Sequence, residues 1–393
     1  MNRMKLGEIL SVKHGWAFKG EYFAEDGEQS ILTPGNFFEK GGFKPNNGKE
    51  RYYTGTYPKE YLCHKGDLIV AMTQQAEGLL GSTALVPENN KYLHNQRIGL
   101  ITCDEKRLNK LFAYYLFMTK SVREQLERSS SGTKVKHTSP EKIYDVEVEI
   151  PDVISQQKIA NLLWSIDEKI ANNNAINDNL EQQAKLLYNY WFIQFNFPDE
   201  NGNPYHSSGG QLVWNKNLQQ EIPQDWRSGN LYDIADYING IACQKYRPSD
   251  EEHSLPVVKI REMNGGITND TERVSSTIPA KNIISSGDIL FSWSASLEVI
   301  MWYGVDAGLN QHIFKVVPKS YFSSEYVYLQ LSEYLIHFIK IAEARKTTMG
   351  HITSEHLQDS HIILPPANII KNFSEYVRPI YQMKKQIANE TSE

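Results

Sequence analysis

The 393-residue sequence has few of the residues that build disulfide-bonded or metal-bound folds. It contains only three cysteines, Cys63, Cys103 and Cys243, which are too far apart for a CxxC motif and odd in number for a disulfide framework. No run of 18 apolar residues occurs, and the first ten residues lack the apolar core of a signal peptide. We therefore expect a cytoplasmic protein with no membrane partner, whose cysteines are buried or incidental thiols.

The sequence also lacks the short motifs of common catalytic sites. It has no P-loop and no HExxH pair, and Asn203-Pro204-Tyr205 lacks one proline of the amine-binding loop of amino-methyltransferases. Pro151-Asp152 with Asp167-Glu168-Lys169 matches the loose PD…(D/E)xK nuclease pattern, but Asp167 to Lys169 fall on the solvent side of a predicted helix. Nuclease carboxylates instead converge on a metal from strand ends. We predict no catalytic residue and no metal site in this chain.

One strand opening occurs twice, as HKGDLIVAM at 64–72 and SSGDILFSW at 285–293. Further landmarks recur in the same order, with an offset that only falls along the chain. The pairs are Leu6 and Leu231 (225 apart), Gly66 and Gly287 (221), Asn95 and Asn310 (215), and His137 and His351 (214). A steadily falling offset is what deletions in a second copy would produce. The chain is therefore predicted to contain two homologous units of roughly 140 to 150 residues, a period far too long for a solenoid.

Each unit is predicted to be α+β, with a curved and largely antiparallel sheet. Gly-Asp turns lead into β-rich runs at 67–72 and 288–293, and residues 144–150 alternate with period two. Apolar residues recur at helical spacing near 108–127 and near 324–344. These two segments are the predicted helices of the two units.

The segment after Pro151 contains no glycine or proline for about 40 residues, which predicts one long helix of about 60 Å at 1.5 Å per residue. Its heptad seam consists of Leu163, Ile166, Ile170, Asn173, Asn177, Leu180, Ala184, Leu187 and Trp191. A shorter seam after Pro366 consists of Phe373, Val377, Ile380, Lys384 and Ile387. An ordinary core helix is the alternative, but a helix this long cannot bury its seam inside one unit. We predict an antiparallel pair of the two helices, with Asn173 and Asn177 fixing the register.

With these features the chain resembles the specificity subunit of type I restriction-modification systems. NYWFIQFNFPDENGNPYHSSGGQLVWNKNLQQEIPQDW at 189–226 is similar to the family's link into its second recognition domain, and SSGTKVKHTSPEKIYDVEVEIPD at 130–152 to the end of a recognition domain. Gln156 stands where the family's helix usually begins with glutamate. The resemblance implies two homologous target-recognition domains (1–151 and 227–365), a central helix (152–195), a linker (196–226) and a C-terminal helix (366–393). That last helix is short, so we expect LLYNYWF at 186–192 to lack a partner.

The same resemblance implies a non-enzymatic subunit that binds double-stranded DNA and reads a bipartite target. Its partners would be two methyltransferase subunits, which bind S-adenosylmethionine and methylate adenine, and the restriction subunits; this chain would hold no cofactor. The partner-binding residues of the central helix would be Leu163, Ile166, Ile170, Leu180, Leu187 and Trp191. Three alternatives stay open: the specificity subunit of a type IIB- or IIG-like enzyme, a single-chain methyltransferase or nuclease fragment, and a scaffold with duplicated interaction domains.

The formal net charge of −6 taken alone argues against a nucleic-acid-binding protein. However, residues 1–150 hold 21 Lys and Arg against 19 Asp and Glu, a surplus of two positive charges. A subunit whose partners embrace the duplex also needs few phosphate contacts of its own. Modest charge is therefore compatible with DNA recognition.

Candidate DNA-reading residues have hydrogen-bonding, cationic or aromatic tips in loops at matched places of both units. Glutamine can bind adenine with two hydrogen bonds, whereas arginine prefers guanine. The predicted DNA-binding residues are Arg51, Tyr53, Gln74, Gln75, Thr133, Lys134, Lys136 and His137 in the first unit, and Arg261, Trp293, Ser294, Arg345, Lys346, Thr348 and His351 in the second. Asn95-Gln96 and Asn310-Gln311 occur in both units and are predicted to be structural.

Overall fold

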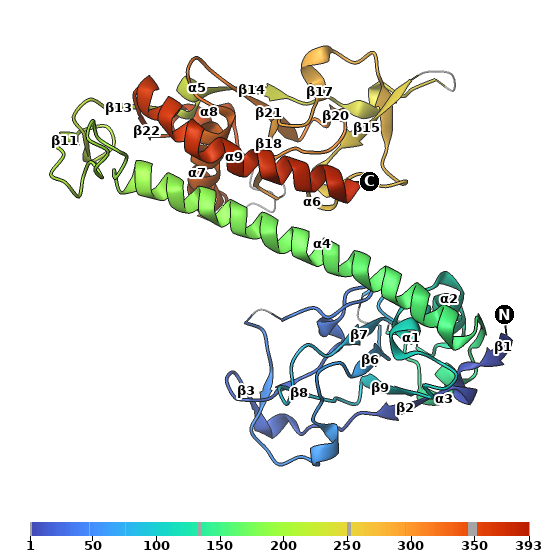
Figure 1. The fold of residues 1–393 in the computed structure, drawn as a ribbon. Helices are drawn as coiled ribbons and strands as arrows, with labels where there is room; N and C mark the ends of the chain where they lie inside the picture. Colours follow the sequence, from blue (N-terminus) through green and yellow to red (C-terminus); the bar gives the residue numbers. More distant parts are fainter. Residues whose placement is uncertain are drawn as a thin grey trace. The chain divides into compact units, whose positions relative to one another are not determined.

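The computed structural model describes residues 2–46, 48–74, 76–132, 135–249, 253–294, 296–344 and 352–392. Two compact units, Met1–Lys169 and Ile170–Glu393, make up the chain. The boundary between them falls inside one long helix, α4 (Val153–Tyr188), drawn in green in Figure 1. In the described ranges, no helix combines the length and the apolar character needed to span a bilayer.

The described residues of the first unit form three small sheets and three short α-helices, followed by the beginning of α4. Its strands are β1 (Asn2–Lys5), β2 (Leu10–His14), β3 (Phe23–Ala24), β4 (Ser30–Ile31), β5 (Tyr52–Tyr53), β6 (Leu68–Ala71), β7 (Thr83–Leu85), β8 (Tyr92–Leu93), β9 (Ile98–Cys103) and β10 (Glu147–Ile150). The sheets have the orders β1-β10, β2-β9-β6-β7 and β3-β5-β4-β8. All these neighbours are antiparallel except β4 and β8, which are parallel.

Strand β6 is entirely apolar because both of its faces are covered. Leu68 and Val70 belong to a core that also contains residues of the helices α1 (Lys110–Leu116), α2 (Lys120–Ser129) and α3 (Pro140–Tyr144). Ile69 and Ala71 point to the other side, into a second core with Leu32. Side chains alternate across a strand, so a central strand between two cores needs an unbroken apolar run.

The second unit repeats most of this topology. Its strands are β13 (Arg227–Gly229), β14 (Ala235–Asn239), β15 (Ser254–Val258), β16 (Arg273–Ser275), β17 (Ile283–Ile284), β18 (Ile289–Ser292), β19 (Glu298–Met301), β20 (Ala307–Leu309), β21 (Ile313–Pro318) and β22 (Ile362–Leu364). The orders are β13-β22, β14-β21-β18-β19 and β16-β15-β20-β17, and β15 with β20 is again the parallel pair. The edge strand β17, however, lies on the side of its sheet opposite to that of β3 in the first unit. The predicted duplication and the predicted α+β class with mainly antiparallel sheets are confirmed.

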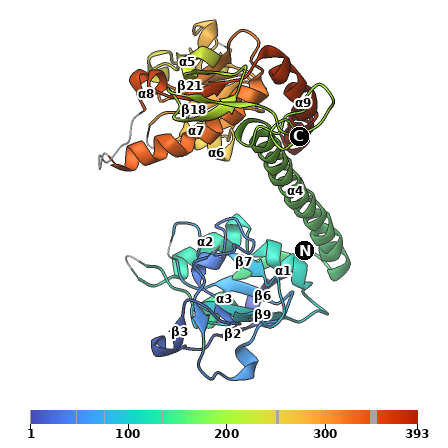
Figure 2. The ribbon, with the colours of Figure 1, turned by 90° about the vertical axis from the view of Figure 1, so that its left-hand side faces the viewer.

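The remaining elements of the second unit are a hairpin and several helices. They are β11 (Leu212–Asn215), β12 (Gln220–Pro223), α5 (Leu231–Ile234), α6 (Ile260–Gly265), α7 (Ser324–Ala344), α8 (Ser354–Gln358) and α9 (Ala367–Ser392). Figure 2 shows α7 along one face of the sheet that contains β18 and β21. Phe338 of α7 stacks on Phe291 of β18 with ring centroids 5.9 Å apart, which joins helix and sheet in one core.

Two local predictions need correction. The helix expected near 108–127 is broken into α1 and α2, because the hydroxyl of Thr119 accepts a hydrogen bond from the backbone N–H of Val122 and starts a new helix. The strand expected over 144–150 begins only at Glu147, and residues up to Tyr144 form α3. The helix expected near 324–344 is α7, as predicted.

Within the second unit, α9 lies antiparallel to the C-terminal half of α4. The ring of Trp191 lies 5.5 Å from that of Phe373, and Lys384 Nζ donates to Glu181 Oε2 at 2.5 Å. Farther along, Asn173 Nδ2 donates to Thr391 Oγ1 at 3.4 Å. Later residues of α9 therefore meet earlier residues of α4, and the expectation that LLYNYWF lacks a partner is wrong.

Burial along the seam of α4 follows the reach of α9. Leu180 is 9 % exposed, whereas Leu163, Ile166 and Ile170 are 37, 48 and 41 % exposed. All members of the α9 seam are buried or half-buried, from Phe373 to Ile387. The predicted antiparallel helix pair is confirmed between Asn173 and Trp191.

Candidate nucleic-acid interface

A turn that begins with Asn-Gln lies at the same place in both units. In the first unit the backbone N–H of Arg97 donates to Asn95 Oδ1 at 3.1 Å, and in the second the N–H of His312 donates to Asn310 Oδ1 at 3.3 Å. An asparagine side chain that bonds the backbone two residues on closes a tight turn. The asparagines thus have the structural role predicted for them, and each turn presents the residue that follows.

A second segment crosses each turn so closely that only glycine fits. A Cβ atom added to Gly15 would lie 2.0 Å from the carbonyl oxygen of Asn95, and one added to Gly240 would lie 2.1 Å from that of Asn310. The next residue then bonds to the turn: the N–H of Trp16 donates to the carbonyl of His94 at 2.9 Å. In the second unit, the N–H of Ile241 donates to the carbonyl of Leu309 at 2.9 Å.

A third segment is the end of the central strand of each unit. The N–H of Met72 donates to the carbonyl of Arg97 at 3.0 Å, and that of Trp293 to the carbonyl of His312 at 3.3 Å. Their own carbonyls accept from Thr138 at 2.9 Å and from Ile352 at 3.0 Å. We call the surface formed by these segments the Asn-Gln edge. It comprises residues 15–18, 72–74, 95–97 and 137–138 in the first unit, and 240–243, 293–294, 310–312 and 352 in the second.

The first-unit edge contains two of the predicted DNA-binding residues. Gln74 is half-buried on the wall of a cavity of about 390 Å³. His137 Nδ1 lies 3.1 Å from the hydroxyl oxygen of Thr73, which fixes the ring against the strand end. Lys136, beside this edge, is in an ion pair with Glu127, so its charge is already partly neutralised.

Arg51 and Tyr53 differ in their surroundings although only one residue separates them. Tyr53 is 5 % exposed and its ring packs edge-on against Phe18 at 4.8 Å, so it is a core residue that cannot contact a base directly. Arg51 is exposed on the wall of a cavity of about 460 Å³, together with Lys49 and Arg97. Of the two, only Arg51 remains a candidate contact.

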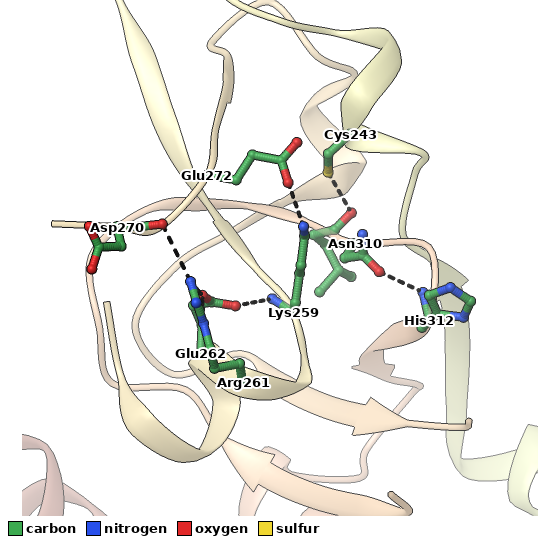
Figure 3. Close-up of polar contacts among 9 residues, drawn as sticks. Cys243, Lys259, Arg261, Glu262, Asp270, Glu272, Asn310 and His312 are labelled. Carbon is green, nitrogen blue, oxygen red and sulfur yellow. Dashed lines mark hydrogen bonds and ion pairs between the residues drawn. The ribbon is translucent and has the colours of Figure 1, made fainter. Parts of the chain in front are cut away.

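The second-unit edge brings Trp293 and Ser294 together around His312. The Trp293 and His312 rings are 5.7 Å apart, and Ser294 Oγ lies 3.2 Å from His312 Nδ1. Arg261 belongs to α6, where its guanidinium lies 2.7 Å from Oε1 of the neighbouring Glu262 and donates to the carbonyl of Asp270 at 3.4 Å (Figure 3). Arg261 is therefore held in an ion pair beside the edge.

The other predicted DNA-binding residues lie outside the described residues: Gln75, Thr133, Lys134, Arg345, Lys346, Thr348 and His351.

Sequence reasoning missed Arg97 and His312, which stand at matched positions and carry different polar tips. The signal was present in the sequence, because each one directly follows the shared Asn-Gln pair. The Asn-Gln pair is predicted to be structural, and that prediction does not extend to the residue after it. Lys49 was missed as well, since its loop gave no periodic pattern.

His94, directly before the first Asn-Gln turn, supports the turn from within the core. Burial lowers the pKa of His94 to about 4, so its ring is neutral near pH 7. Its Nε2 lies 2.8 Å from the carbonyl oxygen of Ile98, and the side chain is fully buried. This histidine therefore holds the turn in place and is not a DNA contact.

Known proteins with similar sequences and folds point to one family. The type I restriction modification DNA specificity domain matches residues 1–182 and again residues 223–392. The specificity subunit of the type I restriction enzyme MjaIX from Methanocaldococcus jannaschii is 25 % identical over 285 residues, which are 69 % of this chain and 62 % of that relative. The EcoBI specificity subunit from Escherichia coli is 22 % identical over 396 residues, 97 % of this chain and 78 % of that subunit.

A solved structure supports the fold. The type I restriction-modification S subunit from M. genitalium aligns over 100 % of this chain and 92 % of its own, with a TM-score of 0.62 and 14 % identity. Two matches to the domain, together covering most of the sequence, agree with the two structurally equivalent units. The chain belongs to the type I restriction modification DNA specificity domain family.

Proposed function

We propose that this chain is the DNA-recognition subunit of a type I restriction-modification complex, working on DNA in the cytoplasm. Each unit reads one half of a bipartite target through its Asn-Gln edge. The central helix α4 determines the length of the unread spacer. The chain itself performs no chemistry and holds no cofactor.

One observation carries this proposal: the two units share the scaffold of the Asn-Gln edge but not its tips. The same backbone hydrogen bonds recur at matched positions, while the exposed Arg97 is replaced by His312. Base edges are read by the side chains that reach them, so different tips on one scaffold suit two different sequences. A scaffold protein with duplicated docking domains would need no such difference.

Methylation and cleavage are assigned to partner subunits. Two methyltransferase subunits would supply S-adenosylmethionine and methylate adenine in each half, and restriction subunits would cut. Of the six residues predicted to bind these partners, Leu163, Ile166 and Ile170 of α4 are exposed. Trp191 belongs to the core of the second unit, Leu180 is 9 % exposed, and Leu187 is half-buried.

Methylation-aware sequencing of a host with and without this gene tests the proposal. We expect a split adenine-methylated motif that disappears with the gene. Exchanging residues 1–150 for the same region of a relative should change one half of that motif and leave the other half unchanged. If both halves change together, the two-reader model is wrong, and if no motif depends on the gene, the scaffold alternative is favoured.

A further inference from the structure

The two Asn-Gln edges are flanked by charges of opposite sign at equivalent positions. The N–H of Ile31 in β4 donates to the carbonyl of Arg51 at 2.8 Å, and the N–H of Val257 in β15 donates to the carbonyl of Glu272 at 2.8 Å. Arg51 is therefore the structural counterpart of Glu272. Two residues earlier, Lys49 in the first unit corresponds to Asp270 in the second.

In the first unit these residues form a purely cationic site. Lys49, Arg51 and Arg97 lie on the wall of the cavity of about 460 Å³, which Phe18 and Asn46 also line, and none of its lining residues is a carboxylate. All three cations are exposed. Among the residues placed by the structure, none forms an ion pair with any of the three. Their charges are therefore available to a ligand.

At the equivalent position of the second unit, the nearby cations are already paired with carboxylates. Glu272 accepts from Lys259 Nζ, and the guanidinium of Arg261 lies 2.7 Å from a carboxylate oxygen of Glu262, which is 1 % exposed. Asp270 adds a third carboxylate, so two cations stand against three acids (Figure 3). Little attraction for an anion remains there.

We propose that the cavity formed by Lys49, Arg51 and Arg97 binds a backbone phosphate of the DNA half read by the first unit, and that the second unit has no equivalent phosphate subsite. This inference rests on the function proposed above. Arginine binds phosphate oxygens with two parallel hydrogen bonds, and a cation that neutralises a phosphate releases condensed counterions. The two halves of the target are thus held unequally, and the salt dependence of binding comes mainly from the first half.

The test uses the full chain assembled with its methyltransferase subunits. Its binding to a duplex carrying the mapped target, and to a scrambled duplex, is measured at several salt concentrations. Arg51→Gln and Arg97→Gln should each make the slope of log K against log salt shallower, and loss of the single phosphate contact accounts for at most about 0.9 in total. Lys106→Gln removes one exposed positive charge of the same unit outside the cavity and should leave the slope unchanged. Thermal unfolding should be the same for all three variants, since each side chain is exposed.

A reciprocal variant tests the second unit. Glu272→Gln releases Lys259 from its carboxylate and should raise the salt slope by up to about 0.9. The inference is overturned if the arginine variants match Lys106→Gln, or if Glu272→Gln leaves the slope unchanged, while the target is still preferred over the scrambled duplex. If the unmodified complex does not prefer the target, the proposed function itself fails.

Discussion

Replacing Lys384 by methionine should loosen α9 from α4, because Lys384 neutralises a carboxylate inside the second unit. Glu181 is only 17 % exposed at its side chain; its Oε2 accepts from Lys384 at 2.5 Å and its Oε1 accepts from the Tyr328 hydroxyl at 2.9 Å. Burial by itself would raise the pKa of the Glu181 carboxyl, but Lys384, Tyr328 and Lys185 outweigh burial and hold that pKa below its ordinary value. The carboxylate is thus ionised and dependent on its partners.

The expected loss of stability in Lys384→Met depends on which partners still stabilise the Glu181 carboxylate. Removing one member of a fully buried ion pair costs about 3 to 5 kcal/mol. In Lys384→Met the Tyr328 hydroxyl still donates to Glu181, and Lys185 Nζ still lies 3.4 Å from its Oε1. We therefore expect a loss of about 2 kcal/mol. The double variant Glu181→Met with Lys384→Met leaves neither charge buried and should recover most of it.

Amide hydrogen exchange of residues 373–387 in the full chain measures the free energy that opens α9. The pair stabilises the fold above the unfolded pKa of glutamate, about 4.3, and this contribution disappears as the pH falls through the lower folded pKa of Glu181. Protection of α9 in the parent chain should therefore decline in acid more steeply than in Lys384→Met. A coupling energy below about 0.5 kcal/mol in the double-variant cycle would refute this account of the helix pair.

Three further perturbations have defined outcomes. Inserting seven residues after Asn174 lengthens α4 by about 10 Å, close to three base pairs, so sequencing should show the same half motifs with a longer spacer; an unchanged spacer would mean that α4 does not set it. Gln156 is fully buried; its side chain accepts from the backbone N–H of Asn109 and donates to the carbonyl of Arg107. Gln156→Leu should therefore destabilise the first unit by about 2 kcal/mol in urea denaturation. The surface control Gln157→Leu should leave the stability unchanged. His94 has its pKa lowered to about 4, so acidification from about pH 6.5 to 4 should cost the first unit up to about 3 kcal/mol, and His94→Gln should lose that acid sensitivity.

The repeat and the long helix could be predicted because both are patterns of residue type along the chain. The position of the helix pair could not, because it depends on where α9 begins. Strand β22 ends at Leu364 within a sheet of the second unit, so α9 starts beside Trp191 and pairs with the nearer half of α4. The short C-terminal helix suggested instead that residues 186–192 have no partner. Such a result follows only from three-dimensional packing.

The sequence does not show which of the candidate site residues are buried or already in ion pairs. Tyr53 lies in a strand of two residues, too short for alternation to reveal which side chain is buried, and it packs with Ile31 and Leu93. Lys136 was expected to be free for phosphate, but its ion-pair partner Glu127 lies nine residues away on a helix whose extent was misjudged. Charges in loops are paired or free according to the fold, which local sequence does not encode.

Glu262 bonds the backbone with its side chain, whereas the side chain of Arg51 is exposed, and the two kinds of position differ in how freely they can change. Glu262 is buried and its Oε2 accepts from the N–H of Lys259 at 3.2 Å, as Asn36 Oδ1 accepts from the N–H of Thr33 at 2.9 Å in the first unit. Both acceptors bond the backbone of the same turn, so changing either leaves a part-buried N–H without its bond and costs stability. Arg51 and its counterpart Glu272 contribute only their backbones to the sheet, and exposed side chains of this kind are usually replaceable within about 0.5 kcal/mol. Exposed charges at these positions can therefore change sign between the units while the backbone hydrogen bonds beside them stay the same.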